Sequence, residues 1–296
     1  MSINAADVIE SIATATEENL REPFRVGQTV HLPAEGELWV TGDIHDHRRN
    51  FAKFVGYADL ANNPTRHVVL HELIHGEHYD EHGCEESWHM LVEAAELKCR
   101  FPGQVHFLMA NHDLAQIHGE GIMKAGVSVC EGFNKGIKRD FGDARYKVQV
   151  AVTELLLSSP LAIKTASGIF VSHSLPSEDK IDDFDYSAFD RDELTKADYT
   201  RQTGAVYNLI WGRRATPAGV DRFLERVGCK LLITGHQPQD EGYALNGDRH
   251  LILASDHNKG VFVPLELDVD YPDIHYVAQN IQRFVALEMP TAQAAE

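Results

Sequence analysis

The sequence predicts an α/β sandwich built on mixed β-sheets, and three observations support this fold class. Five short apolar runs rich in β-branched residues recur along the chain. Segments with helical periodicity separate most of these runs. A β-rich stretch then follows. Alternation of strands and helices followed by such a stretch is typical of an α/β sandwich with mixed sheets.

Local patterns predict each element in turn. The chain begins with an amphipathic helix, in which Asn4 is the N-cap, Asp7 completes a box-like capping signal, and the apolar stripe consists of Val8, Ile9, Ile12 and Leu20. The apolar runs predict strands at residues 39–40, 68–70, 105–109, 169–171 and 231–233. Helical periodicity covers residues 50–60, 87–97, 146–157, 206–211 and 220–227. The β-rich stretch covers residues 243–245, 251–254 and 261–267, and a last amphipathic helix covers about 274–287.

The composition is that of a globular protein. The 296 residues are 43% hydrophobic and 24% charged, which excludes disordered and collagen-like classes. The net charge of −18 repels phosphate backbones, so we expect no nucleic-acid partner. We expect no membrane association, because no apolar run approaches the roughly 18 residues that span a bilayer and the N-terminus lacks a secretory signal. Four cysteines without a C-x-x-C pair indicate reduced thiols and a cytoplasmic location.

Side chains of the types that ligate metal ions follow each of the five predicted strands. The segments are Gly42-Asp43-Ile44-His45, His71-Glu72, Asn111-His112-Asp113, Ser172-His173 and Gly235-His236. Open α/β sheets bind ligands outside the carboxyl ends of their strands, so five strands can deliver these groups to one place. Asp43 and His45 are two residues apart, and an extended chain projects both side chains from the same face. The segments therefore predict a metal site.

The chemistry of these side chains indicates which metals would bind. Carboxylate, imidazole and amide oxygen without thiolate suit a borderline or hard divalent ion such as Mn, Fe or Zn. Asp43 and Glu72 would offset part of the charge of two such ions. Two metals about 3.5–4 Å apart clamp the attacking and leaving oxygens of a displacement at phosphorus. We therefore expect two divalent metal ions as cofactors.

This order of motifs resembles the calcineurin-like metallophosphoesterase superfamily. Within it, the chain is most similar to the phosphoprotein phosphatase branch, which includes bacterial enzymes acting on phosphoproteins and dinucleoside polyphosphates. The resemblance covers about residues 37–267. The specific blocks are the first, the third and Gly235-His236-Gln237, with Gly242-Tyr243 shortly after.

The resemblance implies a fold and a division of the chain. The fold is a four-layer α-β-β-α sandwich with two mixed β-sheets and the metal site at the carboxyl ends of the strands. We expect an N-terminal helix packed on the core in residues 1–30, the metallophosphoesterase domain in 31–270, and a C-terminal helix and tail in 271–296. The implied activity is hydrolysis of phosphomonoesters, either phosphoprotein Ser/Thr or small phosphorylated molecules.

The resemblance also implies site residues. Asp43, His45 and His236 would hold one metal, Asn111 and His173 the other, and Glu72 would bridge them. A hydroxide bridging the metals would attack phosphorus directly. His112 would be the general acid that protonates the leaving oxygen.

The second block departs from the family pattern Gly-Asp-x-x-Asp-Arg-Gly. Glu72 stands at the bridging Asp, His75 at an Asp that orients the catalytic His, and Gly76 at a phosphate-binding Arg. Asp113 or Glu77 is a candidate to orient His112 instead. Cations that could replace the missing arginine as substrate-binding residues are Arg48, which is followed by Arg49, and the pair Arg213 and Arg214. Ala110 also replaces the usual Gly before Asn-His.

Two alternative functions remain open at this stage. His71-Glu72-Leu73-Ile74-His75 is an H-E-x-x-H motif, which on a helix would make a zinc metallopeptidase through His71, Glu72 and His75. Its context disfavours a helix, because it directly follows the β-branched run Val68-Val69-Leu70. The loss of the Asp-Arg pair motivates a second alternative, a catalytically weak relative that binds phosphorylated ligands. The acid-rich residues 178–198 are either a solvated segment or a lid over the site.

Overall fold

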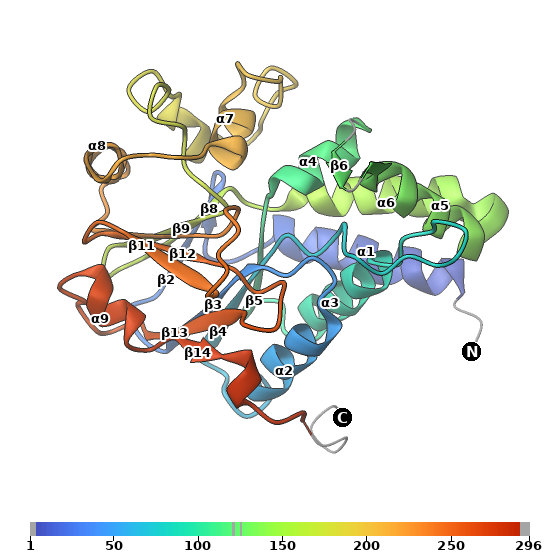
Figure 1. Cartoon of the computed structure of the whole chain (residues 1–296), viewed down its shortest axis with the longest axis horizontal. Helices are drawn as coiled ribbons and strands as arrows, with labels where there is room; N and C mark the ends of the chain where they lie inside the picture. Colours follow the sequence, from blue (N-terminus) through green and yellow to red (C-terminus); the bar gives the residue numbers. More distant parts are fainter. Residues whose placement is uncertain (1–3, 120–121, 125, 291–296) are drawn as a thin grey trace.

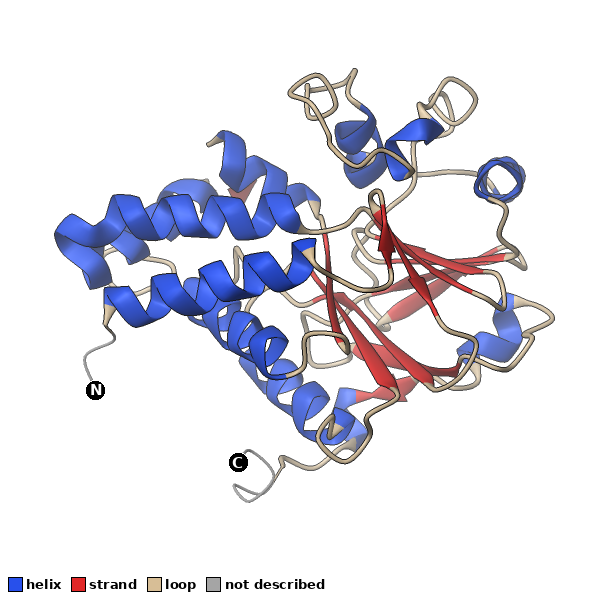
Figure 2. Cartoon of the chain, turned by 180° about the vertical axis from the view of Figure 1, so that it is seen from behind, coloured by secondary structure: helices blue, strands red, loops and turns tan. Residues whose placement is uncertain are grey.

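The computed structural model describes residues 4–119, 122–124 and 126–290. Two β-sheets lie face to face, with helices against the outer face of each, as the views from the front and from behind show (Figures 1 and 2). Both sheets contain parallel and antiparallel neighbours. The expected fold class, a four-layer α-β-β-α sandwich with two mixed sheets, is confirmed.

The five-stranded sheet carries the first three site segments. Its order is β14-β13-β3-β4-β5, in which β3, β4 and β5 run parallel and β13 runs antiparallel to both β3 and β14. The strands are β3 (Glu37–Asp43), β4 (Arg66–His71), β5 (Val105–Leu108), β13 (Val261–Glu266) and β14 (Gln282–Arg283). Side chains of β4 alternate between the two faces, because Val68 and Leu70 pack under the helices whereas Val69 packs between the sheets.

The seven-stranded sheet carries the other two site segments. Its order is β1-β2-β8-β9-β10-β12-β11, with parallel pairing of β9, β10 and β12. The strands are β1 (Arg25–Val26), β2 (Thr29–Leu32), β8 (Ala162–Thr165), β9 (Ile169–Ser172), β10 (Leu231–Thr234), β11 (Tyr243–Asn246) and β12 (His250–Leu253). A separate two-stranded sheet is formed by β6 (Met123–Lys124) and β7 (Val127–Ser128).

Helices cover the two outer faces. The face of the five-stranded sheet is covered by α1 (Ala5–Leu20), α2 (Arg48–Ala58), α3 (Trp88–Arg100), α5 (Val129–Phe141) and α6 (Arg145–Ser158). The face of the seven-stranded sheet is covered by α7 (Ala205–Trp211) and α8 (Pro217–Val227). The remaining helices are α4 (Asn111–His118) and α9 (Ile274–Ala278), with 3-10 turns η1 (Gly142–Ala144), η2 (Tyr186–Phe189) and η3 (Phe284–Ala286).

The two sheets approach each other closely at the end of β3. Asp43 forms an isolated bridge with Ala254, directly after β12, and the Asp43 carbonyl accepts a hydrogen bond of 3.0 Å from Ser255 N. A Cβ on Gly42 would lie 2.2 Å from the Leu253 carbonyl oxygen, so only glycine permits this approach. The carboxyl ends of strands from both sheets therefore meet at one edge of the sandwich.

The N-terminal helix forms as expected, with one difference in its apolar stripe. The Asn4 side chain accepts a hydrogen bond of 3.0 Å from Ala6 N, and Val8 and Ile12 are buried against the core. Leu20, however, is 62% exposed. Leu20 is the last residue of α1, where the helix reaches the edge of the packed layer. Periodicity alone therefore predicted an apolar stripe that is one residue too long.

The expected C-terminal helix at residues 274–287 is wrong in its length. Helix α9 ends at Ala278, and the chain then forms β14, which pairs with β13, and the turn η3. Phe284 in this turn is buried and packs against Phe262. The apolar residues whose spacing suggested a helix therefore belong to a strand that pairs with β13 and to a turn that Phe284 holds against the core. The end of the expected tail, residues 291–296, lies outside the described residues.

Several acids of residues 178–198 stabilise the layer that contains α7 and α8. The Glu178 carboxylate accepts hydrogen bonds from Thr216 N (2.8 Å), before α8, and from Arg222 (2.7 Å), within it. Asp198 accepts hydrogen bonds from Thr195 N and from Arg191. Part of the acidic stretch thus has a structural role. Within the described part of the chain, no helix combines the length and apolarity needed to cross a bilayer.

Candidate metal and phosphate site

The five predicted segments meet at one edge of the sandwich. His45 and Glu72 follow β3 and β4, Asn111 begins α4 directly after β5, and His173 and His236 follow β9 and β10. The backbone turns sharply after three of these strands, because His45, Glu72 and His236 have φ angles of 42°, 39° and 67°. Such left-handed conformations cost about 1–3 kcal/mol each for a non-glycine residue and cluster at functional sites.

One group of donor atoms is formed by Asn111, His173 and His236. The Asn111 Oδ1 atom lies 2.8 Å from both His173 Nε2 and His236 Nδ1. The two ring nitrogens lie 3.2 Å apart, and Glu72 Oε1 lies 3.9 Å from His173 Nε2. The structure therefore brings the His236 side chain to Asn111 and His173, which differs from its expected place with Asp43 and His45.

A second group lies on the other side of Glu72. The Glu72 Oε2 atom is 3.2 Å from His45 Nε2. The His45 Nδ1 atom lies 2.9 Å from the Ile74 carbonyl oxygen, so Nδ1–H donates there and Nε2 keeps its lone pair. The two carboxylate oxygens of Glu72 thus face different groups, as a bridging ligand requires. His45, Glu72 and His112 offer ligand atoms within 4.8 Å of one another.

Asp43 contacts the first group, which Asn111, His173 and His236 form. Its Oδ1 atom accepts a hydrogen bond of 2.9 Å from His236 N and lies 3.6 Å from His173 Nδ1. Burial and the neighbouring Glu72 carboxylate raise the pKa of Asp43 well above its usual value. Two buried carboxylates that repel each other in this way attract a cation.

The electrostatics of the histidines fit metal binding. Burial lowers the pKa of His71 and of His236 to about 4, and lowers that of His173 well below its usual value. These imidazoles are therefore neutral near pH 7 and offer lone pairs, as metal ligands must. In addition, both ring nitrogens of His71 and the Nδ1 atom of His173 are buried without a hydrogen-bond partner among the described residues. The donor set and these unpartnered atoms fit divalent metal ions.

The H-E-x-x-H segment has no helical geometry, so the metallopeptidase interpretation is wrong. Strand β4 ends at His71, and Glu72 and His75 have positive φ angles of 39° and 64°. The His71 ring packs near His173, whereas the His75 ring packs against His112 and Phe133. The two histidines therefore do not lie one helical turn apart on a common face, which the zinc motif requires.

His75 contacts His112. The Nδ1 atoms of the two rings lie 3.0 Å apart, and His75 Nε2 lies 2.9 Å from Gln116 Oε1. His112 also donates its backbone N–H to Glu72 Oε1 over 2.8 Å. The candidate Asp113 instead accepts a hydrogen bond from Ala110 N and caps α4, and the candidate Glu77 is exposed.

Gly76, at the position of the family's arginine, lies against the turn after β3. A Cβ atom on Gly76 would lie 2.4 Å from Asp46 Cβ and 2.8 Å from the His45 carbonyl oxygen. A larger side chain would therefore displace the turn that positions His45. Gly76 N also donates a hydrogen bond of 3.0 Å to Glu85, which ties this position to the loop before α3.

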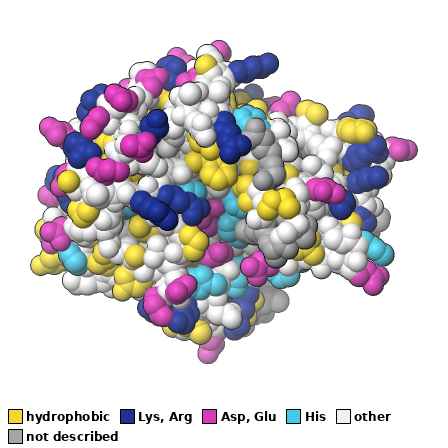
Figure 3. Space-filling model, turned by 45° about the horizontal axis from the view of Figure 1, so that its top comes forward, with side chains coloured by type: hydrophobic (Ala, Val, Ile, Leu, Met, Phe, Trp, Pro, Cys, Tyr) yellow, Lys and Arg dark blue, Asp and Glu magenta, His cyan; other side chains and the backbone are white. Residues whose placement is uncertain are grey.

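Among the candidate arginines, Arg213 contacts the predicted metal ligand His236. Its Nε atom donates a hydrogen bond of 2.9 Å to His236 Nε2. Its neighbour Arg214 is exposed and has a φ angle of 63°. In the space-filling view, histidine and acidic side chains reach the surface together near the middle of one face, with Lys or Arg side chains beside them (Figure 3).

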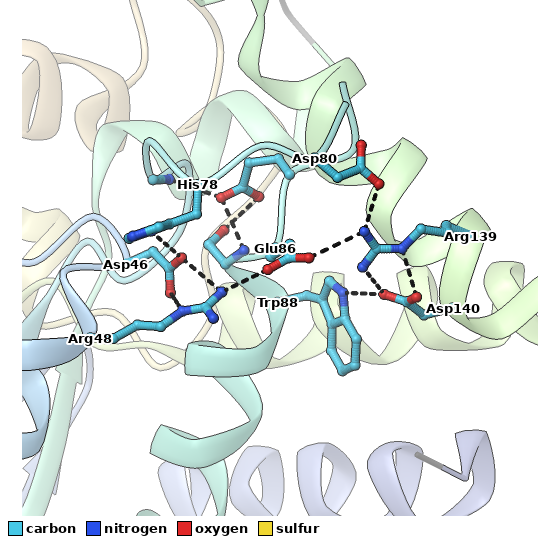
Figure 4. A network of polar contacts seen from close by, with 11 residues as sticks. Asp46, Arg48, His78, Asp80, Glu86, Trp88, Arg139 and Asp140 are labelled. Atoms are coloured by element: carbon cyan, nitrogen blue, oxygen red, sulfur yellow. Dashed lines mark hydrogen bonds and ion pairs between the residues drawn. The ribbon is translucent and has the colours of Figure 1, made fainter. Parts of the chain in front are cut away.

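The Arg48 guanidinium is held in a polar network next to the site (Figure 4). It donates hydrogen bonds to Asp46 over 3.2 and 3.3 Å and to Glu86 over 3.3 Å. Arg139 donates to Glu86 and to Asp80, over 3.2 and 2.8 Å. The network connects the turn after β3, the loop before α3 and helix α5. These contacts give Arg48 a structural role.

Comparisons with known proteins show which family this chain resembles. The family model for calcineurin-like phosphoesterases matches residues 37–240. A probable serine/threonine-protein phosphatase of Encephalitozoon cuniculi (strain GB-M1) is 25% identical over 260 residues, which cover 81% of this chain and 50% of that protein. The chain therefore spans about half the length of this curated relative.

Solved structures share the fold at low sequence identity. A serine/threonine phosphatase from Saccharomyces cerevisiae, described as similar to human phosphatase PP5, superposes with a TM-score of 0.68 at 17% identity and covers 97% of this chain and 92% of its own. A cold-active protein-tyrosine phosphatase of a psychrophilic Shewanella species gives a TM-score of 0.56 at 14% identity, over 80% and 77% of the two chains. The family model covers most of the chain, so the chain belongs to the calcineurin-like phosphoesterase family.

Proposed function

We propose that this protein is a phosphatase that hydrolyses phosphomonoesters with two divalent metal ions, Mn, Fe or Zn. The observation that carries the proposal is the position of Glu72 between two groups of ligand atoms. One carboxylate oxygen lies 3.2 Å from His45 Nε2, and the other lies 3.9 Å from His173 Nε2, next to Asn111 and His236. A carboxylate shared in this way is suited to bridge two ions.

The residues around Glu72 have separate tasks. Asp43, His45 and Glu72 would hold one ion, and Asn111, His173, His236 and Glu72 the other. The bound ions would neutralise the phosphoryl oxygens and activate a water for in-line attack. His112 follows the ligand Asn111 in sequence, and its ring stands 4.7 Å from that of His45, so it can protonate the leaving oxygen.

Arg213 would bind the phosphoryl group. A neutral imidazole has one acceptor nitrogen, so His236 cannot give its Nδ1 lone pair to a metal while Nε2 accepts from Arg213. Metal binding at Nδ1 would therefore release the Arg213 guanidinium, which carries a fork of donors that matches phosphate oxygens. Arg213 would then replace the phosphate-binding arginine of the family pattern, at whose position this chain has Gly76.

The substrate is proposed to be a phosphoprotein Ser/Thr residue or a small phosphorylated molecule. The probable serine/threonine phosphatase among the relatives supports the former class, although the chain covers half of that protein. The Shewanella relative is named a tyrosine phosphatase. A panel containing phosphoserine, phosphothreonine and phosphotyrosine peptides together with nucleotides would identify the preferred class.

The function can be tested with protein stripped by a chelator and reloaded with Mn, Fe or Zn. We expect the reloaded protein to hydrolyse an aryl phosphate, and His236→Ala to lose this activity. His275→Ala is the matched control, because His275 is an exposed histidine that contacts Asp248. Full activity of His236→Ala would contradict the proposal. Metal and phosphate binding without turnover would instead identify a phospho-ligand-binding protein.

A further inference from the structure

His71 is a buried histidine that the function described above does not use. It stands where the family pattern has glycine, directly before Glu72, and its side chain is fully buried at the end of β4. Neither ring nitrogen has a hydrogen-bond partner among the residues that the structure describes. A buried donor or acceptor without a partner destabilises the folded protein, and the imidazole of His71 has two such atoms.

The groups around His71 are metal-ligand side chains. Asp43, His71 and His173 each offer one ligand atom, and these atoms lie within 4.8 Å of one another. His173 presents Nε2 to Asn111 and His236, whereas its other nitrogen, Nδ1, lies 3.6 Å from Asp43 Oδ1 and also has no hydrogen-bond partner among the described residues. Unpartnered nitrogens of two rings therefore flank the same carboxylate.

Strand geometry and a glycine create the space for this ring. Because β4 alternates its side chains, His71 shares the face of Val69, between the two sheets, beneath the site. A Cβ atom on Gly235 would lie 2.3 Å from Asp43 Oδ1 and 3.3 Å from His71 Nδ1. The absence of a side chain at Gly235 thus keeps the region between Asp43 and His71 open.

We propose that His71 is a metal ligand, and that it adds a nitrogen donor to the ion held by Asp43. The inference rests on the proposed metal-dependent function. An additional imidazole shifts the preference of an otherwise oxygen-rich site from Mn toward Zn or Fe. His71 would thus set which metal the site selects.

The direct test is NMR spectroscopy of protein loaded with 113Cd and labelled with 15N at histidine. A ring nitrogen that binds the ion shows a one-bond coupling to 113Cd. We expect coupled rings from His45, His173 and His236 and one further coupled ring, which disappears in His71→Leu. His250→Leu is the matched control, because His250 is a buried histidine of β12, in the seven-stranded sheet, and contacts Thr234 Oγ1 at 2.9 Å.

A second measurement is the affinity for Zn²⁺ by competition with a chelator. Mutation of a residue that hydrogen-bonds to a metal ligand lowers metal affinity by about 10–100-fold. Loss of a ligand itself should therefore lower the affinity for one of the two Zn²⁺ ions by about 100-fold or more. We expect this loss in His71→Leu, a smaller loss for Mn²⁺, and unchanged affinity in His250→Leu. If His71→Leu does not fold, His71→Gly, which carries the residue of the family pattern, replaces it.

The outcomes separate this inference from the proposed function. If the wild-type protein binds metal and only the rings of His45, His173 and His236 couple to 113Cd, His71 is not a ligand and the phosphatase proposal stands. Unchanged Zn²⁺ affinity in a folded His71 variant would likewise show that His71 is not a ligand. If the wild-type protein binds no metal at all, the proposed function fails as well.

Discussion

The Nδ1 atom of His75 lies 3.0 Å from the Nδ1 atom of His112, the proposed general acid, and this contact places a proton on the Nδ1 atom of His112. Gln116 donates its amide N–H to Asn134 Oδ1 over 3.1 Å, so its Oε1 atom accepts from His75 Nε2–H. His75 Nδ1 is then an acceptor, and His112 Nδ1–H donates to it. We therefore expect a histidine and a glutamine to perform the orienting task that an aspartate performs in the family pattern.

Replacement of His75 should therefore impair His112. General acid catalysis contributes about 10²–10⁴-fold to a rate. We expect His75→Ala to lower kcat by part of that range, about 10–100-fold, and His75→Asp to retain much more activity because a carboxylate can accept from His112. Gln116→Leu should have a smaller effect of the same sign. Steady-state kinetics on an aryl phosphate measure these changes, and an unchanged kcat in His75→Ala would show that His112 needs no orienting partner.

Arg213→Ala should weaken substrate recognition. Hydrogen bonds to charged groups contribute about 1.5–3 kcal/mol, which corresponds to about 10–100-fold in kcat/KM. We expect inhibition by inorganic phosphate to weaken in parallel. Arg21→Ala is the control, because Arg21 is an exposed arginine that pairs with Glu17 at the end of α1. If phosphate inhibits Arg213→Ala as strongly as the wild-type protein, another cation binds the phosphoryl group.

Gly76→Ala should destabilise the fold around the first motif. The new methyl group would lie 2.4 Å from Asp46 Cβ, and insertion of extra atoms into packed sites costs about 1–3 kcal/mol. We expect a lower free energy of unfolding in urea and weaker metal binding, because the turn carries His45. Gly103→Ala is the control, since no heavy atom outside its chain neighbours lies within 4 Å of a Cβ there. Equal stability of the two variants would mean that the turn adapts.

Glu85 should make stability depend on pH. Burial raises the pKa of Glu85 from 4.5 to about 7, while its carboxylate accepts hydrogen bonds from Gly76 N, Ser87 N and Ser87 Oγ. The folded protein then holds a proton that the unfolded chain releases, so stability falls as pH rises from about 4.5 to 7 and changes little above it. The total loss corresponds to roughly 3 kcal/mol.

The variant Glu85→Gln tests this dependence because its side chain does not titrate. In urea unfolding of metal-free protein between pH 5 and pH 8, the wild-type protein should lose more stability with rising pH than the variant does. Parallel curves for the two proteins would mean that Glu85 titrates at its ordinary value in the folded state.

The sequence predicted the strands that carry the site because each is a compact apolar run ending at a ligand. It missed β2, in which Thr29 and His31 leave only Val30 and Leu32 as an apolar signal, because pairing with β8 stabilises this strand. It also missed α5, which contains two glycines. A Cβ on Gly136 would lie 2.0 Å from the Glu85 carbonyl oxygen, so tertiary contact explains a residue that disfavours helix.

Within the site, the residue types could be predicted from the sequence, but the directions in which their side chains point could not. The strand ends identified which side chains come together. The left-handed turn at His236, with a φ angle of 67°, determines that its ring joins Asn111, and no spacing in the sequence encodes such a turn. Likewise, the role of His75 depends on the fold of the loop between β4 and α3. The candidate Asp113 accepts a hydrogen bond from Ala110 N and caps its own helix.

Strand β2 has a consequence for synthesis of the chain. Thr29 pairs with Ala162 in parallel register, so β2 emerges from the ribosome long before its partner strand is made. Contacts so distant in sequence form late, and the exposed strand edge can associate with other chains in the meantime. His236 emerges later still. The side chains of the proposed metal site can therefore come together only when most of the protein has been translated.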